Sequence, residues 1–170
     1  VEKAKKEDMD ALALTDAGNM YGAIEFYKVA KAAGIKPILG VDAYLAPRSR
    51  HDRNSGDEAK RSRIVLLAEN NAGYKNLLAL VTKSWTEGFF ERPRMDKELL
   101  REHHEGIIAL LPSFAGDVAQ ALRAGDSDGA AAALYPASGT ATRALVANVL
   151  RQQVEQAREY ERMRDASGKS

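Results

Sequence analysis

Two acidic residues, Asp16 and Asp42, stand in short apolar segments where a carboxylate could do chemistry. Asp16 closes the run Ala-Leu-Ala-Leu-Thr, and Asp42 lies within Pro-Ile-Leu-Gly-Val-Asp-Ala-Tyr. Barrel enzymes place catalytic and metal-binding carboxylates at strand ends. For Asp16 the alternative is the cap of a following helix, which leaves one oxygen free. Because a buried carboxylate needs a partner, Asp42 is compatible with a metal ion and equally with an ion pair to an arginine such as Arg63.

Three histidines, His51, His103 and His104, are the only sources of imidazole in the sequence. His51 lies in the polar loop that leaves the Asp42 segment, either as a ligand near the strand end or as a solvated loop residue. His103 and His104 end a short helix, where a histidine interacts favourably with the helix dipole. We keep this pair as secondary metal-ligand candidates, because pairing of two chains could bring it to a new site.

The loop that follows the Asp42 segment is basic. Planar guanidinium groups bind phosphate through paired hydrogen bonds, so Arg48 and Arg50 are candidates for phosphate binding. A solvated loop, diluted by acidic residues, is the alternative. The basic residues of this loop are Arg48, Arg50, Arg53, Lys60, Arg61 and Arg63.

Apolar strands and amphipathic helices alternate along the chain and would position these residues. Short apolar runs predict strands at residues 11–15, 37–46, 64–68 and 107–111. Helical spacing and Asn, Gly or Asp boundaries predict helices after Gly18, after Asn70, over 96–104 and over 116–123. This alternation is typical of an α/β fold with a parallel sheet.

A cluster of helix-breaking residues at 135–139 separates this pattern from one long helix predicted over 140–164. We therefore expect an α/β domain over residues 1–134 and a helical extension, which serves assembly, over 135–170.

Composition excludes several classes of protein. The 170 residues suffice for one domain, and 25 Lys and Arg against 24 Asp and Glu leave a net charge of +1. We therefore expect neither a nucleic-acid nor a membrane partner. The absence of cysteine excludes disulfides and fits a cytoplasmic protein. A start without Met or an apolar leader is typical of a cut or processed soluble protein.

Several stretches match one known family in order. They are residues 13–27, Ala-Leu-Thr-Asp-Ala-Gly-Asn-Met-Tyr-Gly-Ala-Ile-Glu-Phe-Tyr; 34–40, Gly-Ile-Lys-Pro-Ile-Leu-Gly; 46–50, Ala-Pro-Arg-Ser-Arg; 67–74, Leu-Ala-Glu-Asn-Asn-Ala-Gly-Tyr; and 115–118, Ala-Gly-Asp-Val. Together they resemble the PHP (polymerase and histidinol phosphatase) domain at the N-terminus of bacterial DNA polymerase III alpha subunits. The resemblance covers about residues 3–133, whereas residues 135–170 do not resemble the family's continuation.

The resemblance implies a distorted (βα) barrel that gathers metal ions at the carboxyl ends of its strands. Asp16 matches the acid of the family's Thr-Asp-His-Gly motif, and Asp42 falls where the family has an acidic ligand. Three other ligand positions hold Ala17, Arg63 and Ser113 instead of two histidines and a cysteine. The family's first strand is missing, so we expect a truncated barrel of about four parallel strands plus the long C-terminal helix.

Two functions follow from the resemblance. The first is a small metal-dependent phosphoester hydrolase of relaxed specificity, acting on phosphodiesters or phosphotriesters. Zn²⁺ or Mn²⁺ would be held by Asp16, Asp42 and a histidine, since both metals accept mixed carboxylate and imidazole ligands. The second is a non-catalytic, degenerate PHP module that acts as a structural or interaction domain, which the lost ligands favour.

The expected assembly is a homodimer. A sheet with two open edges and an uncovered apolar face tends to pair with another copy, and the C-terminal helix is the predicted additional contact.

Overall fold

The structure is a computed structural model that describes residues 1–53, 62–112, 116–126 and 129–130. The chain divides into two compact units, Val1–Asp117 and Val118–Ser170. The first unit contains every strand that the structure describes, and helix α6 (Asp117–Arg123) begins at the boundary. The helix predicted over 140–164, the extension predicted from residue 135 and Ser113 lie outside the described residues.

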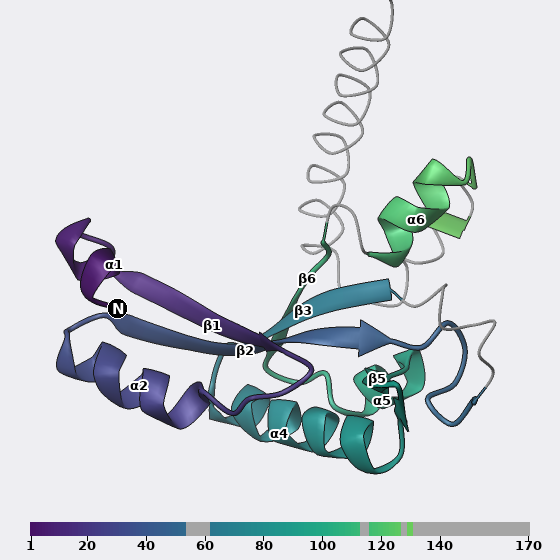
Figure 1. Ribbon diagram of the computed structural model, residues 1–170, viewed down its shortest axis with the longest axis horizontal. Helices are drawn as coiled ribbons and strands as arrows, with labels where there is room; N and C mark the ends of the chain where they lie inside the picture. Colours follow the sequence, from purple (N-terminus) through teal and green to yellow (C-terminus); the bar gives the residue numbers. More distant parts are fainter. Residues whose placement is uncertain (54–61, 113–115, 127–128, 131–170) are drawn as a thin grey trace, which may run out of the picture. The chain divides into compact units, whose positions relative to one another are not determined.

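The first unit is built on an open, mixed sheet (Figure 1). Strand β1 (Ala11–Ala17) pairs in parallel with β2 (Lys36–Leu45). On its other side β2 pairs antiparallel with β3 (Ser62–Ala68), which pairs antiparallel with β6 (Ile107–Leu110). The α/β class is confirmed, whereas the described strands form an open sheet and not a barrel.

The prediction of an all-parallel sheet is wrong, because β3 runs against both of its neighbours. Parallel neighbours need a long crossover, usually through a helix. Here β2 and β3 are successive strands, and the pair Leu45–Ser62 brings the end of one beside the start of the other. The apolar sequence of β3 reflects its burial between two strands, which carries no information on direction.

Residues 92–94, which lie outside the predicted strands, are also strand. β4 (Phe89–Phe90) and β5 (Arg92–Met95) pair antiparallel, and β5 continues in parallel beside Tyr44 and Leu45 at the end of β2. The sheet therefore has six described strands rather than about four.

The predicted helices that fall on described residues are confirmed close to their expected limits. They are α2 (Ala23–Ala32), α4 (Asn71–Thr86), α5 (Lys97–Glu102) and α6. A short helix, α1 (Glu2–Lys6), precedes β1. The Asn70 side chain caps α4 by accepting a hydrogen bond from the Gly73 N–H at 3.0 Å. Figure 1 shows α2 and α4 on one side of the sheet.

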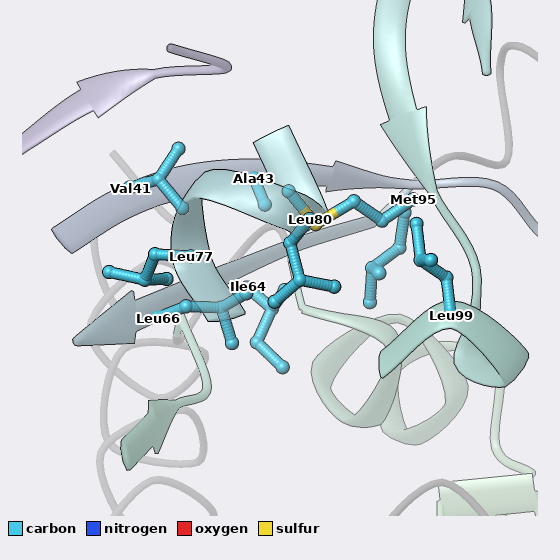
Figure 2. Packing of buried hydrophobic residues seen from close by; sticks show 9 residues of the cluster. Val41, Ala43, Ile64, Leu66, Leu77, Leu80, Met95 and Leu99 are labelled. Atoms are coloured by element: carbon cyan, nitrogen blue, oxygen red, sulfur yellow. The ribbon is translucent and has the colours of Figure 1, made fainter. Parts of the chain in front are cut away.

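The main core lies between α4, α5 and the sheet (Figure 2). Leu77 and Leu80 of α4 are fully buried and pack with Val41 of β2 and Leu66 of β3. The buried positions of α4 are Gly73, Leu77, Leu80 and Ser84. Leu78 of the same helix points away from this contact and is 43% exposed.

The turn after β1 requires glycine at position 18. Gly18 has φ +69°, and a Cβ there would lie 2.8 Å from Cγ of Pro93. Its N–H donates to the Asp42 carbonyl at 2.9 Å, and its carbonyl accepts from Nε1 of Trp85 at 2.8 Å. This turn fixes the carboxyl end of β1 against β2, where the candidate residues lie.

Candidate functional site

The strand register places Asp16 and Asp42 on opposite faces of the sheet. Asp16 pairs with the buried Val41, whereas Ala17 pairs with Asp42. Residues paired across neighbouring strands share a face, and successive residues alternate between faces. The predicted joint site of Asp16 and Asp42 is therefore not formed by these strands.

Asp16 lies on the helix-covered face and contacts the start of α2. Its Oδ2 accepts a hydrogen bond from the Gly22 N–H at 3.1 Å, and Gly22 is the residue that precedes the helix. The helix-start alternative for Asp16 is thus the one observed, although the carboxylate reaches the helix from six residues upstream.

Asp42 lies on the other face, which we call the Asp42 face; it includes Ala17, Asp42, Val65 and Leu110, which follow one another in the register. Arg63 binds both carboxylate oxygens of Asp42, through Nε to Oδ1 at 2.9 Å and through a second hydrogen bond to Oδ2. The two side chains are 22% and 36% exposed, so solvent reaches this pair. Of the two alternatives for Asp42, the structure has the ion pair.

An aromatic ring adjoins this pair. The Arg63 guanidinium carbon lies 5.4 Å from the centroid of the Tyr44 ring, and that of Arg92 lies 6.0 Å from the same centroid. Both distances are within the range of cation–π attraction. The Asp42 face thus combines a carboxylate with two guanidinium groups, a combination that can accept a proton and hold an anion.

Arg50, predicted to bind phosphate, is instead buried in an ion-pair cluster. Its Nη1 lies 3.0 Å from both oxygens of Asp96, and its Nε donates to Glu87 at 2.8 Å. Arg50 is 8% exposed and Asp96 only 2%. These contacts occupy the guanidinium, so the geometry gives Arg50 a structural role.

The charges of this cluster shift each other's ionisation. Burial alone would raise the pKa of Asp96, but the N–H groups of Arg50 and Leu99 and the Arg50 charge hold it below its ordinary value. The hydrogen bond from Arg50 lowers the pKa of Glu87 against the opposing effect of burial. Burial likewise opposes, but does not overcome, the rise in the pKa of Arg50 caused by the two carboxylates. All three groups are therefore charged at neutral pH.

Two further arginines hold the same loop through backbone carbonyls. Arg94, 1% exposed, donates to the carbonyls of Gly88, Arg50 and Asp52, with Nη2 to Asp52 at 2.5 Å. Arg53 donates to the carbonyls of Arg50 and Glu87, both at 2.8 Å. Sequence reasoning missed Arg94, Glu87 and Asp96 as partners of this loop, because no local motif links residues 37 and 46 positions apart.

Arg48, the other predicted phosphate ligand, lies on the exposed surface of this loop. Its Nε lies 3.3 Å from Oδ2 of Asp52, and the two side chains are 66% and 40% exposed. His51 is also exposed, and its N–H donates to the Ser49 hydroxyl at 3.3 Å. No hydrogen bond or ion pair described in the structure joins His51 to Asp42.

His103 and His104 lie at the opposite end of β6 from the level of Asp42. Asp42 is in line with Leu110 at the end of that strand, whereas both histidines precede its start. His104 Nδ1 lies 2.7 Å from the Arg101 carbonyl. His103 ends α5, and its Nε2 is buried without a hydrogen-bond partner in the part of the chain that is described. The chain does not bring these histidines to either aspartate.

The described residues of one chain do not fit the metal site that the resemblance implies. They contain no group of three or more His, Cys, Asp or Glu side chains placed to hold an ion. Both oxygens of Asp42 are bound by Arg63, and its neighbour Ala17 offers no donor atom. Asp42 is therefore a single carboxylate that a metal would have to share with, or take from, Arg63.

No helix among the described residues is long and apolar enough to cross a membrane.

Known proteins that match this chain come from the family that its sequence motifs resemble. The DNA polymerase III subunit alpha of Borreliella burgdorferi is 50% identical over 117 residues, which is 68% of this chain. The corresponding subunits of Thermus aquaticus and Chlamydia trachomatis are 46% and 43% identical over 71% and 75% of the chain. The chain spans about 10% of the length of each of these relatives. A sequence model described as "PHP domain" matches residues 1–157, which extends past the limit near residue 133 expected from the motifs. The chain belongs to the PHP domain family.

Proposed function

We propose that this chain hydrolyses phosphoesters with relaxed specificity, accepting small phosphodiesters or phosphotriesters on the Asp42 face. The observation that carries the proposal is the solvent-accessible pair of Asp42 and Arg63 in a domain of the PHP family. Asp42 occupies the acidic position that the family resemblance marks as functional. Arg63 lies on the neighbouring strand β3, two residues before Val65, which is the register partner of Asp42, and its guanidinium binds the Asp42 carboxylate.

The two side chains divide the chemistry between them. A guanidinium has five N–H donors, more than the two that bond Asp42, so Arg63 can also hold phosphoryl oxygens. Asp42 accepts a proton from a water molecule as the water oxygen forms a bond to phosphorus. The phosphorus–oxygen ester bond then breaks, and the alcohol leaves with a proton from solvent. Arg48, on the exposed loop after β2, is a further contact for a charged substrate, whereas Arg50 is not.

A divalent cation, Zn²⁺ or Mn²⁺, remains part of the proposal because the family resemblance implies one. When bound, such an ion polarises a phosphoryl oxygen and acidifies water. The roles of Asp42 and Arg63 do not depend on such an ion, since the described residues do not form its site. The cytoplasm is the proposed location, as the composition suggests.

The test is turnover of chromogenic phosphodiesters and phosphotriesters by protein purified without chelator, with bound metal measured on the same sample. Asp42→Asn keeps the side-chain volume and removes the base, so kcat/KM should fall by about 100-fold or more. Glu102→Gln, which alters a half-exposed carboxylate of α5 paired with Lys83, is the matched control and should retain the wild-type rate. Removing metal and adding back Zn²⁺ or Mn²⁺ then shows whether an ion is required.

A non-catalytic structural module is the second candidate function. The observation that favours it is the ion pair between Asp42 and Arg63. The two charges neutralise each other, and both oxygens of the carboxylate at the family's acidic position are bound by Arg63. In that case the folded protein shows no turnover, and Asp42→Asn costs only about 1 kcal/mol of stability, as expected for a partly exposed ion pair. Absence of turnover with and without added metal would reject the hydrolase and leave this alternative.

A further inference from the structure

The cation that Asp42 holds belongs to the chain itself. The Arg63 guanidinium binds one carboxylate oxygen through Nε at 2.9 Å and the other through Nη2. Two parallel hydrogen bonds are the geometry in which a guanidinium and a carboxylate fit best, and such charge-assisted bonds are stronger than neutral ones. Both oxygens of Asp42 are therefore already engaged by a positive charge.

The sheet fixes Arg63 over this carboxylate. In the register of β2 and β3, Arg63 is paired with Tyr44 and lies diagonally from Asp42, at a separation that a long side chain spans. The guanidinium carbon is also 5.4 Å from the centroid of the Tyr44 ring, a cation–π distance. A tethered partner of this kind acts at an effective concentration that is millimolar even for a flexible linker. A free ion has to displace this partner in order to bind Asp42.

The surroundings of Asp42 offer a metal ion little in exchange. Ala17, the register partner of Asp42 on β1, has no donor atom in its side chain. No group of three or more His, Cys, Asp or Glu side chains is placed to hold an ion in the described part of the chain. Arg92 adds a second guanidinium, 6.0 Å from the centroid of the Tyr44 ring. A divalent ion approaching Asp42 therefore meets two positive charges and one carboxylate.

We infer that Arg63 is the resident cation of Asp42 and keeps divalent ions off this carboxylate. The family resemblance implies an acidic metal ligand at this position, so the inference is a difference between this chain and the family pattern. A divalent ion that assists hydrolysis, as proposed above, would have to bind without Asp42. The inference concerns ion binding alone and holds whether or not the chain hydrolyses esters.

The experiment is a titration of the full chain with Mn²⁺, followed by the paramagnetic broadening of backbone amide signals in NMR spectra. The broadening is strongest close to a bound ion, so even weak binding at Asp42 is detected at the amides of Ala17, Asp42 and Gly18, whose N–H donates to the Asp42 carbonyl. In the wild type these amides should broaden no more than in Asp42→Asn. The same spectra show whether each variant is folded.

Arg63→Gln frees the carboxylate and removes a positive charge beside it. It should reach the same broadening of these amides with at least about 10-fold less Mn²⁺ than the wild type. The gain should disappear in the double variant of Arg63→Gln and Asp42→Asn. Arg92→Gln is the matched control, because it removes a guanidinium beside the same ring for which no bond to Asp42 is described. Since solvent and salt screen this more distant charge, its effect should stay below about 3-fold.

Broadening in the wild type that Asp42→Asn abolishes would overturn the inference, and this comparison needs no change at Arg63. So would an Arg63→Gln titration that matches the wild type, or an equal gain from Arg92→Gln. The titration contains no ester, so these outcomes are distinct from the absence of turnover that would reject the hydrolase.

Discussion

Replacing Asp96 by asparagine isolates the charge in the Arg50 cluster. The substitution keeps the side-chain shape, and asparagine caps a helix as well as aspartate does, so the start of α5 is preserved. What is lost is the partner of a guanidinium that is 8% exposed, along with charge-assisted hydrogen bonds at 2.9 and 3.0 Å. Removing one member of a buried ion pair costs about 3–5 kcal/mol. Because Glu87 still binds Arg50, we expect about 3 kcal/mol, the lower end of that range.

The assay is urea unfolding at pH 7, followed by circular dichroism. Asp52→Asn removes a carboxylate from an exposed pair with Arg48 in the same loop and should cost at most about 1 kcal/mol. Asp96→Ala should cost about 1 kcal/mol more than Asp96→Asn, because it also removes the cap. Equal losses for Asp96→Asn and Asp52→Asn would refute the view that burial makes this pair important.

The same pair predicts how stability depends on pH. The pKa of Asp96 in the folded protein lies below the ordinary value of 3.8. A group with a depressed folded pKa stabilises the protein fully above its unfolded pKa, and that stabilisation is lost as the pH falls through the folded pKa. Wild-type stability should therefore fall on acidification below about pH 4, and Asp96→Asn should show a shallower dependence there. Parallel curves for the two proteins would contradict this assignment.

Three other substitutions test the packing that supports the site. Leu77→Ala empties a fully buried position and should cost about 2–5 kcal/mol in urea unfolding, whereas the exposed Leu78→Ala should cost far less. Gly18→Ala places a side chain at φ +69° and against Pro93, so its melting temperature should fall by the equivalent of at least about 1–2 kcal/mol; an unchanged value would mean that the turn is not held as described. Trp85→Phe removes the hydrogen bond to Gly18 and should cost about 1 kcal/mol of unfolding free energy. The loss in the double variant with Gly18→Ala should differ from the sum of the two single losses, because the two residues are in contact.

Local patterns predicted most of the elements, because hydrophobic runs and capping residues act over a few positions. Asn70 and Asp96 mark the starts of α4 and α5 as their sequence positions indicate. The direction of β3 could not be predicted in this way, since an apolar run is compatible with either pairing. β5 was missed because Arg92-Pro93-Arg94 is polar in sequence, although Arg94 is buried with its guanidinium on backbone carbonyls.

The candidate site was predictable only in part. The sequence identified Asp42 and named Arg63 as its possible partner, and the structure contains that pair. It also grouped Asp16 with Asp42. In the structure the two carboxylates lie on opposite faces of the sheet, because Asp42 is in register with Ala17 and side chains alternate between faces along a strand. Arg50 and Arg48 are two positions apart and equally basic, yet only long-range packing makes one a buried structural residue and leaves the other exposed.

The Arg50 cluster also constrains the order in which the chain can become structured during synthesis. Arg50 leaves the ribosome well before its partners, since Glu87 and Asp96 follow 37 and 46 residues later. At a translation rate of roughly 5–20 residues per second, the loop waits on the order of a few seconds for the carboxylates that fix it. The β1–α2–β2 segment can pair beforehand, because its contacts are nearer in sequence. The nascent loop therefore exposes an unpaired arginine during this interval, and its final conformation is set by residues translated after it.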